Sequence, residues 1–460
     1  MRCLVLEILK KVCKSIYFAL SFACLPAVVW GNTLEELQDP FAGFDEIDIV
    51  SKPVTKTKKS IFNHFSGYGK FLTVANTTHS SPGPEYRDWH GLSGLKMETL
   101  LEANFRFADW KAFTSIKGWY DFAYSLNGRD GYTNSVLDEY EKELELREAY
   151  IQGNLSSFID LKIGRQIVVW GRSDNFRVTD ILNPLDNRNL GLVDIENLRL
   201  PLAMVKIDIF SGNWNLDLIS IHEHRYDQNP PFGHFFYPST DPLPPEKTPS
   251  NTLENMEMAA ELSTTFSGWD ISFYGAHYFN DQPTFSTTNP TNLEHHQITM
   301  VGSSMSLAHG DLLYIAELAH FKRLHFLNNY HKQYNRSELL FGIEYSGLPD
   351  TNISLDYVNR HIHHYDDILD SSPEGPKKSE NSIALRISRD FIQDTLELSA
   401  LVMLNGEQGQ YGAMQRFTVK YDIADNWSMK SGLLLYQARN GLMKEVGDSN
   451  RVYCELRYDF

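Results

Sequence analysis

The last ten residues of the chain, 451-RVYCELRYDF-460, alternate between two kinds of side chain. A repeat of two residues is the period of a β-strand, in which successive side chains point to opposite faces. The stretch therefore predicts a strand with one apolar and one charged face that runs to the final residue. The apolar face carries Val452, Cys454, Leu456, Tyr458 and Phe460, and the other carries Arg451, Tyr453, Glu455, Arg457 and Asp459.

The same alternation recurs upstream, for example in 416–421 and 339–345. We count about 18 candidate strands, with about 16 as the alternative, because strand boundaries taken from one sequence err by a few residues. Short turns and long loops alternate between them, and one of the long loops is expected at 326–336. Even strand number and alternating connections are typical of transmembrane antiparallel β-barrels, which have short periplasmic turns and long external loops. The sequence thus predicts an all-β transmembrane barrel with charged side chains toward a wet lumen.

The N-terminus predicts export. Arg2, Lys10, Lys11 and Lys14 precede an apolar stretch at 16–29, which is the pattern of a secretory signal peptide and assigns residues 1–31 to it. About 14 apolar residues are too few to span a bilayer as a helix. No later stretch is long and apolar enough to do so, and only a closed barrel could then cross a membrane. We expect an outer-membrane location.

Residues 32–65 lack strand alternation, and we expect a periplasmic N-terminal extension or a small plug there, with the barrel at 66–460. The formal net charge of −17 argues against nucleic acid as a partner, because phosphates attract basic surfaces. The aromatic end of the last strand resembles the C-terminal assembly signal of bacterial outer-membrane barrels. That resemblance assigns Tyr458 and Phe460 to recognition by the barrel-assembly machinery.

One predicted external loop, the third, differs from the others. Between Trp170 and Leu200 it mixes arginines and carboxylates with many apolar residues, which makes it too apolar to extend into water. We expect it to fold into the lumen as a constriction, with its arginines facing carboxylates across the pore. The alternative is a solvated surface loop with weak local ion pairs. The constriction residues are Arg172, Asp174, Arg177, Asp180, Asp186 and Arg188.

The polar faces of the expected strands line the lumen with both signs of charge. This mixture disfavours a phosphate channel, which should carry a ladder of basic residues. The residues that we assign to the lumen with most weight are Arg386, Arg416, Lys420, Arg451, Glu455 and Arg457.

Three motifs, 146-LREAY-150, 164-GRQ-166 and 180-DILNPLD-186, resemble a proteobacterial outer-membrane family, the domain of unknown function 1302. The resemblance implies a porin-like barrel in contact with outer-membrane lipids, with a possible inner-membrane exporter and periplasmic partner. It supplies no substrate. Arg165 would face lipid unless a bulge at Gly164 turned it inward.

We therefore predict a channel for passive or partner-coupled passage of a small or amphiphilic solute. A membrane-embedded hydrolase is the first alternative, because His361, His363 and His364 lie near Asp366 and Asp367, and His222-Glu223-His224 forms a second cluster, both in expected loops. An adhesin or structural barrel is the other. We assign no catalytic residue, metal ligand or cofactor.

Overall fold

The computed structural model describes residues 62–79, 87–237, 241–371, 375–437, 447 and 449–460. The expected signal peptide, residues 1–31, and residues 32–61 of the expected extension lie outside the described residues. Residues 62–65, which we had placed in that extension, belong to the first strand.

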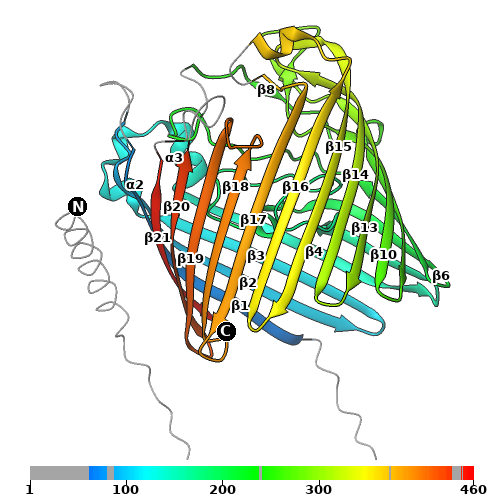
Figure 1. Ribbon diagram of the computed structural model, residues 1–460, viewed down its shortest axis with the longest axis horizontal. Coiled ribbons are helices and arrows are strands. Elements are labelled where there is room, and N and C mark those ends of the chain that lie inside the picture. The colour runs from blue at the N-terminus through cyan, green and yellow to red at the C-terminus, as the bar shows by residue number, and fades with distance from the viewer. Residues whose placement is uncertain (1–61, 80–86, 238–240, 372–374, 438–446, 448) are drawn as a thin grey trace, which may run out of the picture. The chain divides into compact units, whose positions relative to one another are not determined.

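Eighteen strands form one antiparallel sheet that closes on itself, as the sequence predicted (Figure 1). Each strand pairs with the next one along the chain, and the last strand pairs with the first. The strands are β1 (Phe62–Asn76), β2 (Gly91–Phe107), β3 (Trp110–Asp121), β4 (Lys142–Ser156), β5 (Ile159–Gln166), β6 (Leu202–Ser211), β7 (Trp214–Ile221), β9 (Glu257–Phe266), β10 (Trp269–Phe279), β13 (Gln297–His309), β14 (Leu312–Phe326), β15 (Asn329–Leu348), β16 (Thr351–His363), β17 (Ser379–Phe391), β18 (Leu396–Asn405), β19 (Gly412–Ala424), β20 (Trp427–Gln437) and β21 (Arg451–Asp459).

The closing seam joins the two ends of the described barrel. Along it, Tyr68 to Asn76 of β1 pair with Asp459 to Arg451 of β21. Beyond the ladder, Gly67 and Phe460 exchange two backbone hydrogen bonds of 3.0 Å each. Closure leaves no unpaired strand edge, which a sheet in hydrocarbon requires because lipid offers no hydrogen bonds.

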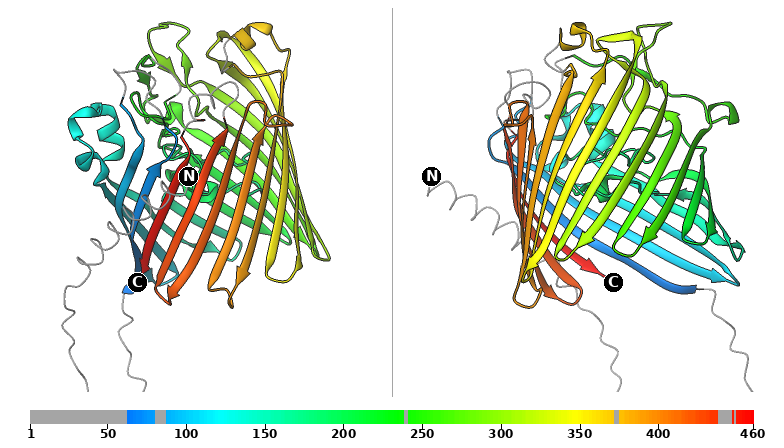
Figure 2. Two further views of the ribbon diagram at one scale, coloured as in Figure 1. Left: turned by 60° about the vertical axis from the view of Figure 1, so that its left-hand side comes forward. Right: turned by 45° about the vertical axis from the view of Figure 1, so that its right-hand side comes forward.

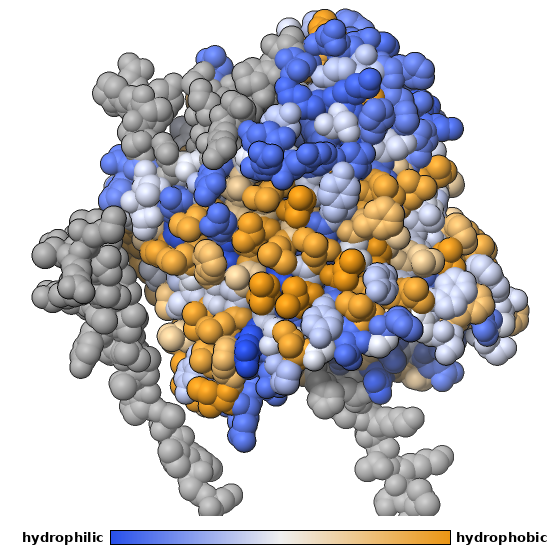
Figure 3. All heavy atoms as spheres, in the orientation of Figure 1, coloured by the Kyte–Doolittle hydropathy of each residue, from blue (hydrophilic) through white to orange (hydrophobic). Residues whose placement is uncertain are grey.

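The two faces of the sheet differ as the alternation predicted. On β19, Phe417 and Val419 are 42% and 45% exposed on the outer surface, whereas the intervening Arg416 and Thr418 are buried inside. Figure 3 shows the resulting apolar band around the viewed face, with hydrophilic surface above it. Burying such a band in lipid is the main driving force for insertion.

Short turns gather at one end of the barrel and long connections at the other (Figure 2). One expected long loop, 326–336, is wrong. β14 and β15 continue as a hairpin there and turn at Leu327-Asn328, with Leu324 paired to Tyr334 and Phe326 to Asn329.

The long connections contain small elements that the sequence did not predict. These are α2 (Ala123–Leu126), α3 (Asn134–Tyr140), α4 (Ile195–Leu198), three 3-10 turns at Arg129–Gly131, Leu253–Asn255 and Asp367–Ser371, and a small sheet of β8 (Glu246–Lys247), β11 (Thr284–Phe285) and β12 (Leu293–Glu294). Thr133 caps α3 by accepting from the Val136 N–H at 3.3 Å. No helix in the described ranges has the length and apolarity of a membrane span.

Candidate functional site

The connection between β5 and β6, residues 167–201, has an internal framework of polar contacts. Asp180 is its centre. Its carboxylate accepts from Arg177 Nε at 3.1 Å, from Arg199 Nε at 2.9 Å and from the Trp170 N–H at 3.2 Å. Asn183, fully buried, accepts from the Val168 N–H and donates to the Leu200 carbonyl, each at 2.8 Å, so it ties the start of the segment to its end.

A carboxylate of the barrel wall holds the first part of this segment. Glu317 of β14 is 2% exposed and accepts four hydrogen bonds from 172–179. The Arg172 and Ser173 N–H groups bind one of its oxygens at 2.6 and 3.1 Å, and the Thr179 N–H and hydroxyl bind the other at 3.1 and 2.7 Å. Gly171 lies against this carboxylate with φ +79°, where a Cβ would be 3.0 Å from Glu317 Oε1.

Two further carboxylates fix the same part of the segment. Asp356 of β16 accepts from the Ser173 hydroxyl and from Asn175 Nδ2, each at 2.8 Å. Arg172 forms an ion pair with Asp270 of β10 and donates to the Ser272 hydroxyl at 3.1 Å. The segment thus bonds to β10, β14 and β16, which lie four, six and eight strands from β5 in the ring of 18.

The next part of the segment bonds to the last strands of the barrel. Asp194 pairs with Arg386 of β17 at 3.1 Å and with Arg416 of β19. Burial raises the pKa of Asp194, but Arg416 and Arg386 more than offset this and hold the pKa below its ordinary value. The Leu190 carbonyl accepts from Tyr436 of β20 at 2.6 Å and from Arg451 of β21 at 2.5 Å.

A buried arginine provides the third anchor. Arg188, 3% exposed, pairs with Asp186 at 2.8 Å, with Glu143 of β4 at 2.9 Å and with Glu139 of α3 at 3.2 Å. Burial alone would raise the pKa of Asp186, yet its hydrogen bonds with Arg188 keep that pKa below the usual range. A guanidinium group serves several carboxylates at once because its donors fan out in one plane.

The predicted constriction residues therefore have different roles. Arg172 and Arg188 pair with carboxylates of other elements, and Arg188 also pairs with Asp186 of its own segment. The expectation for Arg177 was wrong, because its partner Asp180 belongs to the same segment. Asp174 is exposed, and no hydrogen bond or ion pair of its side chain occurs among the described residues.

Of the residues assigned to the lumen, Arg386, Arg416 and Arg451 bind the segment, as described above. The other three pair with neighbouring side chains. These pairs are Lys420 with Asp422 at 3.5 Å, Glu455 with Lys70 at 3.4 Å and Arg457 with Asp459 at 2.6 Å. Glu317 was not identified as a site residue from the sequence. The available signal was a carboxylate between Ala316 and Leu318 on the inward face of an alternating strand.

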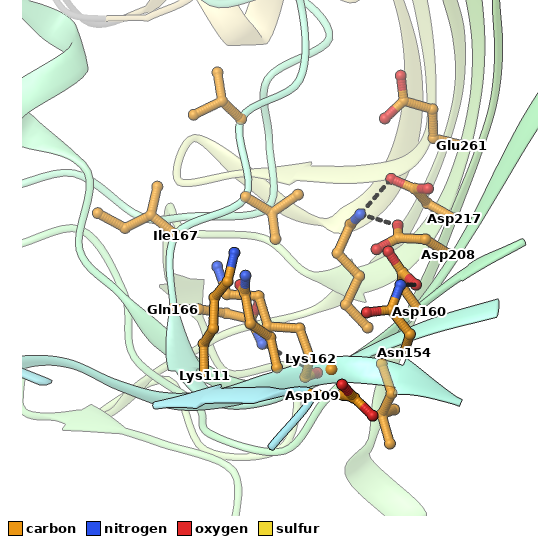
Figure 4. Close-up of a pocket in the computed structure, with 16 residues that line it drawn as sticks. Asp109, Lys111, Asn154, Asp160, Lys162, Gln166, Ile167, Asp208, Asp217 and Glu261 are labelled. Atoms are coloured by element: carbon orange, nitrogen blue, oxygen red, sulfur yellow. Dashed lines mark hydrogen bonds and ion pairs between the residues drawn. The ribbon is translucent and has the colours of Figure 1, made fainter. Parts of the chain in front are cut away.

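A cavity of about 540 Å³ lies beside the start of the segment. Four carboxylates, Asp160, Asp208, Asp217 and Glu261, form a row of directly paired positions on β5, β6, β7 and β9. In Figure 4 they lie on one side, and Lys111 and Gln166 lie on the other. The cavity lining holds five carboxylates against three lysines when Asp109, Lys162 and Lys206 are included.

Lys206 neutralises part of this row, since it pairs with Asp208 and, at 2.7 Å, with Asp217. The ammonium group of Lys162 instead lies 3.8 Å from the ring centroid of Tyr150. By formal charge the lining carries five acidic and three basic groups, and a net negative charge attracts cations.

The histidines considered for hydrolysis lie elsewhere. His361 and His363 are part of β16 and not of a loop, and they share its outward face with Tyr357. Within the described ranges, no three His, Cys, Asp or Glu side chains form a group that could hold a metal ion.

Arg165 retains the position given by regular alternation. The register shows no bulge at Gly164, so Arg165 shares the outward face of β5 with Ile163. It pairs there with Glu223 at 3.1 Å. This ion pair lowers the cost of placing a guanidinium group at the edge of the apolar band.

A closed 18-stranded barrel with an apolar outer band defines the protein as a porin-like barrel of the outer membrane. The chain belongs to the family described as protein of unknown function DUF1302, whose model matches residues 86–361. No curated protein sequence matches the chain.

Solved structures with a similar fold include OccAB3 and OccAB4 of Acinetobacter baumannii. OccAB3 is 11% identical to this chain, and the match covers 86% of this chain and 99% of OccAB3. OccAB4 is 10% identical, and the match covers 86% of this chain and 97% of OccAB4. Each superimposes with a TM-score of 0.51. The outer membrane channel DcaP of the same organism is 10% identical over 86% of this chain and 96% of its own, with a TM-score of 0.43. At these identities the likeness concerns the fold alone.

Proposed function

We propose that the protein is an outer-membrane channel whose lumen is narrowed by residues 167–201 and which passes small solutes with a preference for cations. The observation that carries this proposal is the set of four hydrogen bonds from 172–179 to Glu317. The segment starts at β5 and bonds to β14, β16 and β17, which lie six, eight and nine strands away in the ring of 18, and this supports a path across the lumen or its mouth. A segment held across a pore sets its width and the charge that a solute meets.

The charge left over after pairing supports the cation preference. Most arginines of the segment are neutralised by carboxylates, as described above. The carboxylates of the cavity outnumber its lysines, and Asp174 adds an exposed negative charge. A water-filled passage lined by net negative charge raises the local concentration of cations.

The anchoring also bears on solute size. Passage of a bulky amphiphilic solute would require the segment to leave Glu317 and Asp356, and its Asp194 to leave Arg386 and Arg416, all together. Each charge-assisted hydrogen bond contributes roughly 1.5–3 kcal/mol, so release of all three anchors is costly. These contacts favour passive passage of small solutes. Passage of a larger cargo would need a partner, such as the inner-membrane exporter that the family resemblance implies.

Planar-bilayer recording tests the proposal. The purified protein should give stepwise currents, and a salt gradient should give a reversal potential of the sign for cation preference. Absence of any conductance from correctly folded protein, judged by heat-dependent gel mobility, would contradict a channel. A reversal potential of the anion sign would contradict the charge argument alone.

A further inference from the structure

The outward face of six adjacent strands changes from apolar to polar at a common height. Below the change the outward residues include Phe273, Val301, Leu318, Phe341 and Tyr357, all exposed. Above it they are polar, apart from Phe279 at the end of β10. The polar outward residues that directly follow the last apolar ones are His277 on β10, Thr299 on β13, His320 on β14, Ser337 on β15, Asn359 on β16 and Asn381 on β17.

The strand pairing shows that this change follows the membrane plane. Asn359 pairs with Leu339 and Asn381, so the boundary on β16 and β17 lies one outward position below that on β15. The boundary on β14 is level with that on β15, and on β13 and β10 it lies one outward position higher. The strands lean in Figure 1, and a level boundary across leaning strands has to shift in this stepwise way.

A β-bulge on β14 places two cations at this boundary. The register between β14 and β15 shifts between Phe321 and Leu324, and Arg323 has φ +66°. Lys322 and Arg323 are both exposed, although consecutive strand residues ordinarily point to opposite faces. A left-handed backbone is unfavourable for arginine, and bulges often serve to direct a side chain.

The height of these cations matches the outer edge of the apolar band. Lys322 lies ten residues after Leu312, which begins β14 at the short-turn end of the barrel. Ten residues extend about 33 Å along a strand, and about 25 Å along the membrane normal at a typical tilt of about 40°. An apolar band about 25 Å tall is what such barrels bury. Lys322 and Arg323 therefore lie at the level of the outer-leaflet headgroups.

Hydrogen-bond donors surround the two cations, and among the described residues no ion pair joins either cation to a carboxylate. Arg323 Nη2 lies 3.4 Å from His277 Nδ1 and 3.5 Å from the Thr299 hydroxyl. The Ser337 hydroxyl shares hydrogen bonds with His320 at 2.9 Å and with His363 at 2.8 Å. The outward positions of β10 and β13 to β17 hold no Asp or Glu, so the charge of the patch is not neutralised there.

We infer that this outward patch, formed by Lys322, Arg323, His277, His320, Ser337 and His363, binds the phosphorylated headgroup of an outer-leaflet glycolipid. In a Gram-negative outer membrane that lipid is lipopolysaccharide. Lysine and arginine at headgroup level attract phosphate, and the neighbouring hydroxyl and imidazole groups donate to its remaining oxygens. The acyl chains would then lie on the apolar residues directly below. This inference does not depend on the channel proposal, because it uses only the outer surface.

Lipid titration followed by native mass spectrometry tests the patch. The whole protein in detergent is titrated with bisphosphorylated lipid A and, separately, with the same lipid after dephosphorylation. We expect the phosphorylated form to bind more tightly. The double variant K322Q/R323G should bind it about 25-fold more weakly, that is about fivefold for each cation removed. Glycine suits the backbone at position 323, so this variant should fold.

Arg389→Gln is the matched control. Arg389 lies on the outward face of β17 at the opposite end of the barrel, paired with Thr351 beside a short turn. Its loss should leave lipid A binding unchanged. Equal binding of the two lipids, unchanged binding by K322Q/R323G in protein that retains heat-dependent mobility, or an equal loss in R389Q would each overturn the inference. Displacement of lipid A by millimolar inorganic phosphate or by phosphatidylglycerol vesicles would also overturn it, because the patch would then recognise phosphate in general.

Discussion

Glu317 of β14 accepts a hydrogen bond from the hydroxyl of Thr179 at 2.7 Å, although 138 positions separate the two residues in the chain. The same carboxylate accepts three backbone N–H groups of the segment, so one wall residue satisfies four donors. Segment 167–201 is thereby joined to β14, six strands along the ring from β5, and under the proposed function its release should widen the pore.

The first prediction concerns Glu317→Gln. An amide has one acceptor oxygen instead of two and directs its NH₂ group at backbone donors, so each lost bond should cost roughly 1–3 kcal/mol. We expect a larger and noisier single-channel conductance. Glu344→Gln on the adjacent β15 is the control, because no hydrogen bond joins Glu344 to the segment among the described residues. Equal currents from both variants and the native protein would show that the Glu317 contact does not restrain the pore.

The second prediction is that deletion of residues 175–189 raises conductance, because it removes much of the segment while leaving Asp194 to bind Arg386 and Arg416. Arg177→Ala should act differently. Arg177 pairs inside the segment with Asp180, so its loss should loosen the segment and alter conductance more than selectivity. The check is to measure single-channel conductance and, separately, the reversal potential in a salt gradient for each variant. A selectivity change in R177A without any change in conductance would contradict the internal role.

The third prediction concerns the charge of the cavity. Replacing Asp208 and Asp217 by Asn leaves Lys206 without its two partners, so the reversal potential in a salt gradient should move toward anion preference. Lys111→Gln removes a cation from the same cavity and should move it the opposite way. High salt should weaken both effects because it screens charge. Shifts of the same sign in the two variants would refute the electrostatic explanation.

The fourth prediction concerns pH and an external loop. His234 is buried against Tyr140, with ring centroids 4.4 Å apart, and against Trp89 at 5.0 Å. Burial, together with nearby Arg451 and His79, lowers the pKa of His234 well below its ordinary value. The ring is therefore neutral in the folded loop and takes up a proton only when the loop opens. Stability from this packing is complete above pH of about 6.5 and decreases as pH falls below that value.

Hydrogen exchange of residues 231–237 measures this effect. Exchange should become faster between about pH 6.5 and pH 5 in the native protein. His234→Gln should remove this dependence, because glutamine does not titrate. A native protein whose exchange, corrected for intrinsic rates, is constant over this range would contradict the prediction.

The fifth prediction concerns assembly. Deleting Phe460 removes the two backbone hydrogen bonds with Gly67, each contributing about 1 kcal/mol, at the seam that closes the barrel. The deletion, and the double change of Tyr458 and Phe460 to Ser, should both lower the amount of protein in the outer membrane. The serine variant keeps the backbone bonds, so comparison of the two separates side-chain recognition from seam closure. Native levels of both variants would show that the aromatic end has no role in assembly.

The sequence by itself determined the architecture and the assignment of side chains to the two faces. A repeat of two residues is a local property, and in a barrel it decides which residues face lipid and which face inward. For this reason alternation alone assigned Arg386, Arg416 and Arg451 to the inward face, and in the structure each of them bonds to segment 167–201. Bounds were less certain where local composition misleads, as in 326–336, whose polar residues resemble a loop but continue a hairpin.

Only the tertiary structure decided the partners of these residues. Arg172 and Arg177 lie five positions apart in one segment and are chemically identical, yet one pairs with Asp270 of β10 and the other with Asp180 nearby. Glu317 and Thr179, or Asp194 and Arg416, meet because closure of the barrel brings distant strands around one lumen. An ion pair depends on distance in space, and the order of residues in the chain does not fix that distance until the ring of strands is closed.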